Sequence, residues 1–165
     1  MGSRRGFTLI EILLVAGIMA ILGTGIFLAL DRYQFGRNLE LDAKTLLYAI
    51  RDAQQRSITQ EVSSGDTPAQ WGVVITRTAV APSYFELVAQ AVGRTSTVTS
   101  PITRFQLRNG VEFASAVAST SIIFSRVSGT PLVGGTTTVS LYLISNSAER
   151  KTITIDAQNG QAKLF

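Results

Sequence analysis

The hydrophobic pattern changes twice along the 165-residue chain. Residues 7–30 are apolar on every side of a helix, with Glu11 as the only charged residue and no proline. Residues 37–61 carry apolar side chains at spacings of three and four, which is the pattern of an amphipathic helix. From Gln70 onward, short β-branched and aromatic stretches alternate with polar residues, as they do in strands. The pattern therefore predicts an α+β protein with one long N-terminal helix followed by an antiparallel sheet.

The apolar helix predicted for residues 7–30 has the length of a membrane span. About twenty apolar residues at about 1.5 Å rise per residue cross a hydrocarbon core of about 30 Å. Arg4 and Arg5 precede the run, and Asp31 and Arg32 follow it. Positive charge on a short flank stays in the cytoplasm, so we expect a single-pass inner-membrane protein with an exported C-terminal part. A cleaved secretory signal fits less well, because its apolar core is shorter and no Ala-x-Ala site follows near Asp31.

The amphipathic segment 37–61 is expected to continue the same helix and to pack one face on the sheet. Turn-forming residues at 63–68, which include glycine and proline, are expected to end it. The apolar stripe consists of Leu39, Ala43, Leu46, Ile50 and Ala53, with Leu47 and Ile58 beside it. The polar face carries Arg37, Glu40, Asp42, Lys44, Arg51, Asp52, Gln55 and Arg56.

Seven or so short strands are expected after the helix. Residues 102–108 end at an Asn109-Gly110 turn and residues 111–113 resume the alternation, so 102–113 can form a hairpin. Asn159-Gly160 is expected to turn the chain into its last strand, and the polar tract 94–100 to be a loop or an exposed edge. The remaining expected strands are residues 71–76, 84–89, 121–125, 137–144, 150–156 and 162–165.

Glu11 is the anomaly of the apolar helix. A carboxylate deep in hydrocarbon costs about 2.5–3.5 kcal/mol on insertion scales, so its position needs a reason. In one interpretation Glu11 lies in the headgroup region and is stabilised by the N-terminal end of the helix dipole. In the other it meets a positive charge supplied by another subunit.

The residues around Glu11 favour the second interpretation. The run Arg4-Arg5-Gly6-Phe7-Thr8-Leu9-Ile10-Glu11 resembles the leader junction of type IV prepilins and of type II secretion pseudopilins. The resemblance implies a membrane peptidase that cuts between Gly6 and Phe7 and methylates the new Phe7 amine. It implies that Glu11 pairs with the N-terminal amine of a neighbouring subunit during assembly. The implied partners are other pilin or pseudopilin subunits in a homo- or hetero-filament, the prepilin peptidase/methyltransferase and an inner-membrane assembly platform.

The resemblance also implies the pilin fold. Its expected parts are a leader peptide at residues 1–6, a membrane and filament-core helix at 7–30, an amphipathic helix at 31–62 and a sheet domain at 63–165. The second helical segment, the loop at 129–131 and the closing Asn159-Gly160 hairpin look most like minor subunits of the FimT/GspH type. Many relatives carry a proline in the second half of the first helix. This chain instead has Gly17, Gly23 and Gly25, which leaves open where that helix bends.

The composition excludes several kinds of chemistry. Cysteine and histidine are both absent, so a thiol nucleophile, a Ser-His-Asp triad, a histidine-ligated zinc and a disulfide are excluded. The acidic residues are dispersed, and neither a calcium loop nor a phosphate-binding glycine loop occurs. From these absences we expect no enzymatic activity, no metal and no cofactor, and the resemblance implies a structural subunit of a pilus or pseudopilus.

Two other functions remain open at this stage. The formal net charge of +4 falls on removal of residues 1–6, which leaves 13 basic and 11 acidic side chains. Arg104 and Arg108 are candidate DNA contacts, since some FimT-like minor pilins take part in DNA uptake. The same basic set includes Arg94 and Arg126 and can extend to Arg150 and Lys151. Ordinary solubilising charge explains them better, because no interleaved aromatic residues form a stacking platform. The third alternative is a membrane-anchored exported domain that never polymerises.

Overall fold

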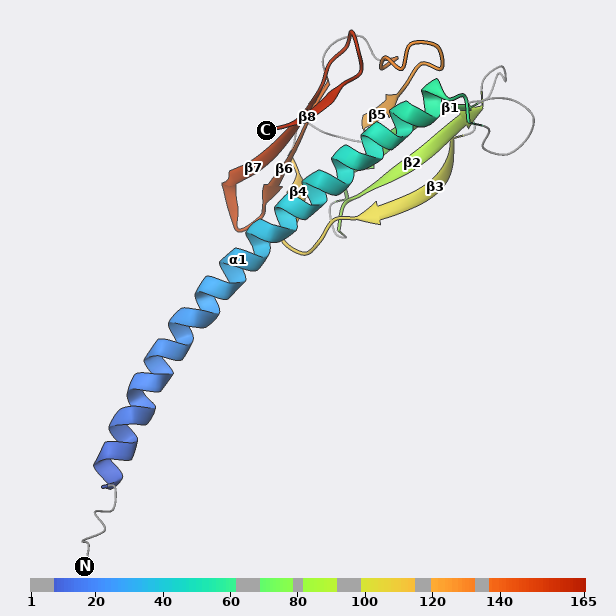
Figure 1. The fold of residues 1–165 in the computed structure, drawn as a ribbon. Coiled ribbons are helices and arrows are strands. Elements are labelled where there is room, and N and C mark those ends of the chain that lie inside the picture. Colours follow the sequence, from blue (N-terminus) through green and yellow to red (C-terminus); the bar gives the residue numbers. More distant parts are fainter. Residues whose placement is uncertain (1–7, 62–68, 79–81, 92–98, 115–119, 133–136) are drawn as a thin grey trace, which may run out of the picture. The chain divides into compact units, whose positions relative to one another are not determined.

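The computed structural model describes residues 8–61, 69–78, 82–91, 99–114, 120–132 and 137–165, apart from the side chains of residues 25–29, 69, 91, 99 and 100. The chain forms two compact units, residues 1–34 and 35–165. Helix α1 (Leu9–Ile58) contributes to both units (Figure 1). All eight strands of the described part belong to the second unit. The predicted α+β architecture, a long N-terminal helix and antiparallel strands, is confirmed.

The first unit contains the start of α1 and is apolar on its surface. Between Leu9 and Leu22 its large hydrophobic side chains are exposed, from 77% for Leu9 to 49% for Val15. The helix includes Gly17, Gly23 and Gly25 without a break in its assignment. Among the described residues, no helical stretch is long and apolar enough to be a candidate membrane span. Phe7 and the side chains of residues 25–29, which the predicted span includes, lie outside the described part.

In the second unit α1 buries the predicted stripe. Leu39, Ala43, Leu46, Ile50 and Ala53 are all buried, because spacings of four and three keep them on one helical face. Two predictions for this helix are wrong. Ile58 is 51% exposed, since it lies at the last turn, and Asp42, which was expected on the polar face, is only 2% exposed.

The helix ends earlier than the turn-forming residues at 63–68 suggested. Gln60 has a φ of 54°, the left-handed conformation that terminates helices. The Gln60 N–H donates to the Ser57 carbonyl oxygen at 3.2 Å, and the Glu61 N–H donates to the Arg56 carbonyl oxygen at 3.0 Å. This pair of bonds is a Schellman motif, which satisfies the last carbonyl groups of the helix.

The strands form two antiparallel sheets rather than one. The first has the order β3-β2-β1-β5 and the second has the order β4-β6-β7-β8. The strands of the first sheet are β1 (Ala69–Thr76), β2 (Tyr84–Ala91), β3 (Thr99–Gln106) and β5 (Thr120–Ile123). Those of the second are β4 (Val111–Phe113), β6 (Thr137–Leu143), β7 (Asn146–Ile155) and β8 (Ala162–Leu164).

The predicted hairpin over residues 102–113 is wrong. β3 pairs with β2, whereas β4 pairs with β6 in the other sheet. The backbone between the two strands has other partners: the Leu107 N–H donates to the Ser83 carbonyl oxygen at 2.9 Å, and the Arg108 N–H donates to the Asp42 carboxylate at 2.7 Å. The Asn109-Gly110 turn therefore passes the chain from one sheet to the other. Of the tract 94–100, residues 99 and 100 belong to β3, an edge strand, and the rest lies outside the described residues.

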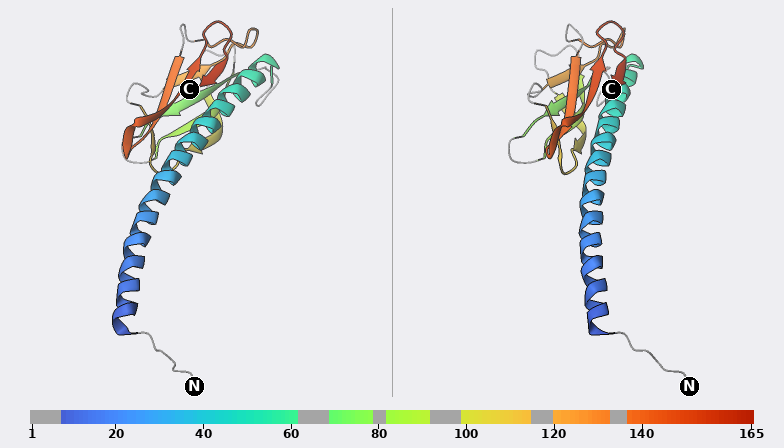
Figure 2. Two further views of the ribbon diagram at one scale, coloured as in Figure 1. Left: turned by 60° about the vertical axis from the view of Figure 1, so that its left-hand side comes forward. Right: turned by 90° about the vertical axis from the view of Figure 1, so that its left-hand side faces the viewer.

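One hydrophobic core joins α1 to both sheets. Its strand residues alternate along the chain as period-two strands require, for example Trp71, Val73 and Ile75 in β1. The second sheet lies alongside the later part of α1 in both views of Figure 2, and the Arg51 Nη2 group donates to the Ala162 carbonyl oxygen at 3.1 Å. The core is thus built from elements far apart in sequence.

The predicted Asn159-Gly160 turn connects β7 to β8. Gly160 has a φ of 68°, and a Cβ atom there would collide with the Gly129 carbonyl oxygen. The Gln54 Nε2 group of α1 donates to the carbonyl oxygens of both Gly129 and Asn159 at 3.0 Å. Glycine at 160 is therefore required both by its conformation and by the close approach of a second loop.

Candidate functional site

The first candidate site is the N-terminal turn of α1, where Thr8 caps the helix. The Thr8 N–H and the Thr8 Oγ1 hydroxyl donate to Glu11 Oε2 at 3.2 Å and 3.1 Å. In return the Glu11 N–H donates to Thr8 Oγ1 at 3.4 Å. This reciprocal arrangement of a threonine and a glutamate three residues later is a capping box. It satisfies N–H groups that the first turn of a helix leaves without partners.

The sequence analysis missed this role of Glu11, although its signal was present. The pattern Thr8-Leu9-Ile10-Glu11 followed by apolar residues is the sequence signature of a capped helix start. The interpretation that Glu11 lies near the helix start and benefits from its dipole agrees with this geometry. Only one carboxylate oxygen is used, because Oε1 has no hydrogen-bond partner among the described residues.

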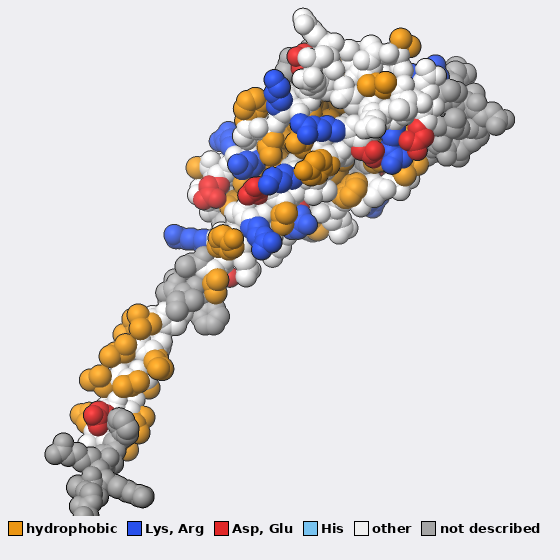
Figure 3. All heavy atoms as spheres, in the orientation of Figure 1, with side chains coloured by type: hydrophobic (Ala, Val, Ile, Leu, Met, Phe, Trp, Pro, Cys, Tyr) orange, Lys and Arg blue, Asp and Glu red, His pale blue; other side chains and the backbone are white. Residues whose placement is uncertain are grey.

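The surroundings of Glu11 are apolar and exposed. Leu9, Ile10, Ile12 and Leu13 flank it in sequence, and each is more than half exposed. Figure 3 shows hydrophobic side chains covering this part of the helix. The Glu11 carboxylate therefore has one oxygen without a hydrogen-bond partner among the described residues. The apolar surface around it is not covered by any described part of the chain. The predicted cleavage residues Gly6 and Phe7 lie outside the described residues.

The two candidate DNA contacts, Arg104 and Arg108, do not form a common patch of unpaired charge. The Arg104 Nε group donates to Glu86 Oε1 at 2.8 Å, and its guanidinium lies 4.4 Å from the centre of the Tyr84 ring. The Arg108 guanidinium forms an ion pair with the buried Asp42 carboxylate. Each arginine is therefore already neutralised within the chain.

The ion pair between Asp42 and Arg108 ties α1 to the turn between the two sheets. Asp42 accepts both the Arg108 N–H, at 2.7 Å, and the Arg108 guanidinium. Burial raises the pKa of Asp42, and the two hydrogen bonds and the positive charge of Arg108 oppose that rise. This contact joins residues 66 positions apart, so no local pattern could predict it.

The outer face of the same helix carries an exposed ion pair. The Lys44 Nζ group donates to Glu40 Oε1 at 2.6 Å, four residues away. This hydrogen bond and the charge of Lys44 lower the pKa of Glu40. Figure 3 shows Lys and Arg side chains interspersed with acidic ones on the face that carries this helix. Among the described residues, no three acidic side chains gather into a group that could hold a metal ion.

Comparisons with known proteins agree with the site and the fold. Residues 1–27 match the family described as the prokaryotic N-terminal methylation motif. The fold is similar to the crystal structure of the type IV minor pilin FimU of Pseudomonas aeruginosa strain PAO1, with a TM-score of 0.54. The two chains are 15% identical, and the similarity covers 78% of this chain and 89% of the other. No curated protein sequence matches the chain significantly.

The two findings concern different parts of the molecule and agree with each other. The motif covers the start of α1, and the fold similarity extends over most of the chain. The protein has the prepilin N-terminal motif and the fold of a type IV pilin, which confirms the family resemblance drawn from residues 4–11.

Proposed function

We propose that this chain is a minor structural subunit of a type IV pilus or of a type II secretion pseudopilus. A prepilin peptidase cuts it between Gly6 and Phe7 and methylates the Phe7 amine. Residues 7–30 hold it in the inner membrane before an assembly platform moves it into a filament that is periplasmic or extracellular. The minor role is supported by the likeness to FimU, which is described as a minor pilin.

The observation that carries the proposal is the uncovered apolar surface of α1 between Leu9 and Leu22. A helix that is hydrophobic on all sides requires burial in lipid or among other helices. Each Å² of apolar surface removed from water contributes about 25 cal/mol, so the exposed side chains provide a driving force for both environments. In a membrane the helix is surrounded by lipid, and in a filament helices of sister subunits replace that lipid.

Glu11 gives the bundle its register in this proposal. Its Oε2 atom is held by the Thr8 cap, and Oε1 is free to accept a hydrogen bond from the Phe7 amine of a neighbouring subunit. An unpaired charge in an apolar bundle is strongly unfavourable. A subunit shifted along the bundle would leave its Glu11 carboxylate unpaired, so the paired position is favoured. The Thr8 cap therefore holds the Glu11 carboxylate in position, and the negative charge of Glu11 attracts the Phe7 amine of the neighbouring subunit.

The test separates the charge of Glu11 from its capping role. Glu11→Gln keeps a side chain that can cap at this position but removes the charge. Thr8→Ala removes the cap but leaves the charge. We expect filaments to lack the Glu11→Gln subunit and to contain the Thr8→Ala subunit, as measured by immunoblotting of sheared filaments.

Two measurements accompany the test. The mass of the N-terminal peptide reports cleavage after Gly6 and methylation of Phe7, which should be normal in both variants. Normal incorporation of the Glu11→Gln subunit would contradict the pairing role. A chain that keeps Met1 in the native envelope and is never found in filaments would contradict the proposed function as a whole and favour a non-polymerising anchored domain.

A further inference from the structure

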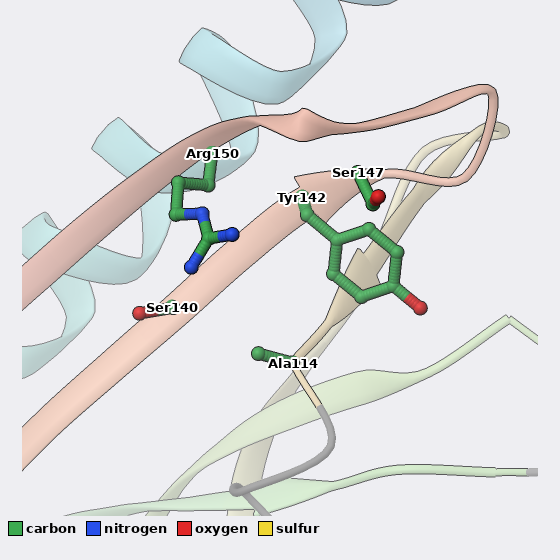
Figure 4. A pocket seen from close by; sticks show the side chains of 5 residues that line it. All are labelled: Ala114, Ser140, Tyr142, Ser147 and Arg150. Atoms are coloured by element: carbon green, nitrogen blue, oxygen red, sulfur yellow. The ribbon is translucent and has the colours of Figure 1, made fainter.

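The second sheet carries a pocket on the face turned away from the core. The pocket has a volume of about 250 Å³ and is lined by Ala114, Ser140, Tyr142, Ser147 and Arg150 (Figure 4). In β6 the residues Val139, Leu141 and Leu143 are buried in the core, so Ser140 and Tyr142 point to the opposite side. The pocket is thus built on paired strands and not on a loop alone.

The strand register brings the polar groups of the pocket together. Tyr142 of β6 lies directly opposite Arg150 of β7, and Ser140 lies opposite Thr152. Residues opposite each other in an antiparallel pair have Cβ atoms about 4.5–5.5 Å apart. In Figure 4 the Arg150 side chain extends along the sheet toward Ser140, with the Tyr142 ring and the Ser147 hydroxyl on the other side of the opening.

The Arg150 side chain has no ion pair or hydrogen bond among the described residues. The carboxylates nearest in the strand pattern are used elsewhere. Glu149 accepts a hydrogen bond from Asn146 Nδ2 at 3.1 Å, and Glu112, which lies opposite Tyr142 on its other side, accepts the Phe113 N–H at 2.8 Å. The pocket therefore contains a guanidinium whose charge the described chain does not neutralise.

The lining of the pocket matches a small, hydroxylated anion. A guanidinium binds a carboxylate through two parallel hydrogen bonds. The hydroxyl groups of Ser147 and Tyr142 can exchange hydrogen bonds with hydroxyl groups of a ligand. The Ser140 hydroxyl shares a hydrogen bond of 3.0 Å with the Thr152 hydroxyl and keeps further capacity to accept one. The Tyr142 ring offers an apolar face, and Ala114 adds an aliphatic side chain among the described residues of the lining.

We propose that this pocket binds an acidic sugar, with its carboxylate on Arg150 and its ring against the face of Tyr142. The serine hydroxyls bind the hydroxyl groups of the sugar. The site lies on the sheet domain and uses no residue of the N-terminal helix. The proposal is therefore independent of the assembly function proposed above, and either can fail alone.

The test is a titration of the full-length protein with three probes. The protein is kept in a detergent without a sugar headgroup, because maltoside detergents would present the ligand chemistry themselves. The probes are D-glucuronate, D-glucose, which lacks the carboxylate, and acetate, which lacks the ring. We expect weak but saturable calorimetric binding of glucuronate, and at least about tenfold weaker binding of the other two.

Variants of the lining residues complete the test. Arg150→Gln should weaken glucuronate binding at least about tenfold, and Tyr142→Ala should weaken it several-fold, whereas Tyr142→Phe keeps the ring and most of the affinity. Arg77→Gln, which removes the same charge at an exposed position directly after β1, is the matched control and should bind normally.

Three results would overturn the proposal. They are no saturable binding of glucuronate, equal binding of acetate and glucuronate, or unchanged binding by Arg150→Gln. Arg150 is exposed and has no partner in the described chain, so its substitution should leave the fold intact, which circular dichroism can verify. If the Tyr142→Ala variant does not fold, glucuronate binding by the Arg150→Gln variant decides whether the proposal holds.

Discussion

The two halves of helix α1 differ in the solvent exposure of their apolar side chains. Between Leu39 and Ala53 most apolar residues occupy one face and are buried against both sheets, whereas Leu41 and Tyr48 are exposed. Between Leu9 and Leu22 they occupy every face, and their large side chains are exposed. Both segments are helical and both are rich in leucine and isoleucine. The difference lies in what covers them: the later half has its partners within the chain.

Because of this difference, the later half of α1 contributes to the stability of the chain, whereas the first half carries the proposed assembly function. Residues of the later half contribute to folding of the chain by itself, because their burial is complete in one molecule. The apolar side chains between Leu9 and Leu22 remain exposed in the single chain, so they contribute little to its folding. Changes in the two halves should consequently be detected by different measurements, and three predictions follow from that contrast in order of expected effect.

The largest effect is expected from a pair of identical substitutions. Leu46→Ala removes a fully buried side chain and should lower the free energy of unfolding by about 2–5 kcal/mol. Leu13→Ala, at a position 62% exposed, should leave it unchanged. Thermal unfolding followed by the fluorescence of Trp71, the only tryptophan of the chain, reports on the core of the second unit directly. Equal destabilisation by Leu46→Ala and Leu13→Ala would contradict the claim that only the later half of α1 stabilises the single chain.

A smaller effect is expected from removing a buried hydroxyl group near the end of the later half. Ser57 Oγ is buried, accepts the Trp71 N–H at 2.8 Å and lies 3.3 Å from the carbonyl oxygens of Trp71 and Phe124. Ser57→Ala leaves a buried N–H without a partner and should cost about 1–3 kcal/mol of unfolding free energy.

Thr24→Ala is the matched control for Ser57→Ala. Its hydroxyl donates to the Ile21 carbonyl oxygen of its own helix at 2.8 Å and is exposed. Water can replace that bond, so no loss of stability is expected in the same unfolding experiment. Destabilisation by Thr24→Ala comparable to that by Ser57→Ala would contradict the view that the first half adds little to the stability of the free chain.

The smallest effect concerns pH and the buried Asp42. Its pKa in the folded protein is raised above 3.8 by burial, so the folded state binds the proton more tightly than the unfolded state. Stability from this group is present below the unfolded pKa and is lost as the pH rises through the folded pKa. Relative to Asp42→Asn, which does not titrate, the native protein should lose unfolding free energy as the pH rises above 3.8.

Urea unfolding of both proteins across this acidic range measures the difference. A matched comparison uses Glu40→Gln on the exposed face, where Lys44 lowers the pKa of Glu40 and stability is instead lost as the pH falls. Because that pair is exposed, its effect should be too small to measure. If the native protein gained stability over Asp42→Asn as the pH rises, the charge of Arg108 would outweigh the burial of Asp42.

Local patterns were sufficient for the elements of this fold. Residues spaced by three and four predicted the buried face of α1, and two-residue alternation located most strands. The pairing of strands was harder, because pairing depends on contacts between distant segments. The Asn109-Gly110 dipeptide favours a hairpin locally, but the chain there is held by Ser83 and Asp42 and passes to the second sheet.

The candidate sites differ in the same way. Glu11 could be singled out from sequence, because a lone carboxylate in an apolar run violates a local rule. Its cap with Thr8 was equally local and could have been predicted. The pairing of Arg104 with Glu86 and of Arg108 with Asp42 could not be predicted, and neither could the pocket around Arg150, since each combines residues from segments that are distant in sequence.

The amino-acid sequence by itself determined the helix, its change from an all-apolar to an amphipathic half, the prepilin-type N-terminal motif and the sites of the main turns. These properties depend on residues within a few positions of one another, where helix and strand periods act directly. Only the tertiary structure decided that the strands divide into two sheets, that Asp42 is buried, and which arginines keep an unpaired charge. Those outcomes depend on which distant groups meet, because burial and ion pairing are properties of the packed molecule.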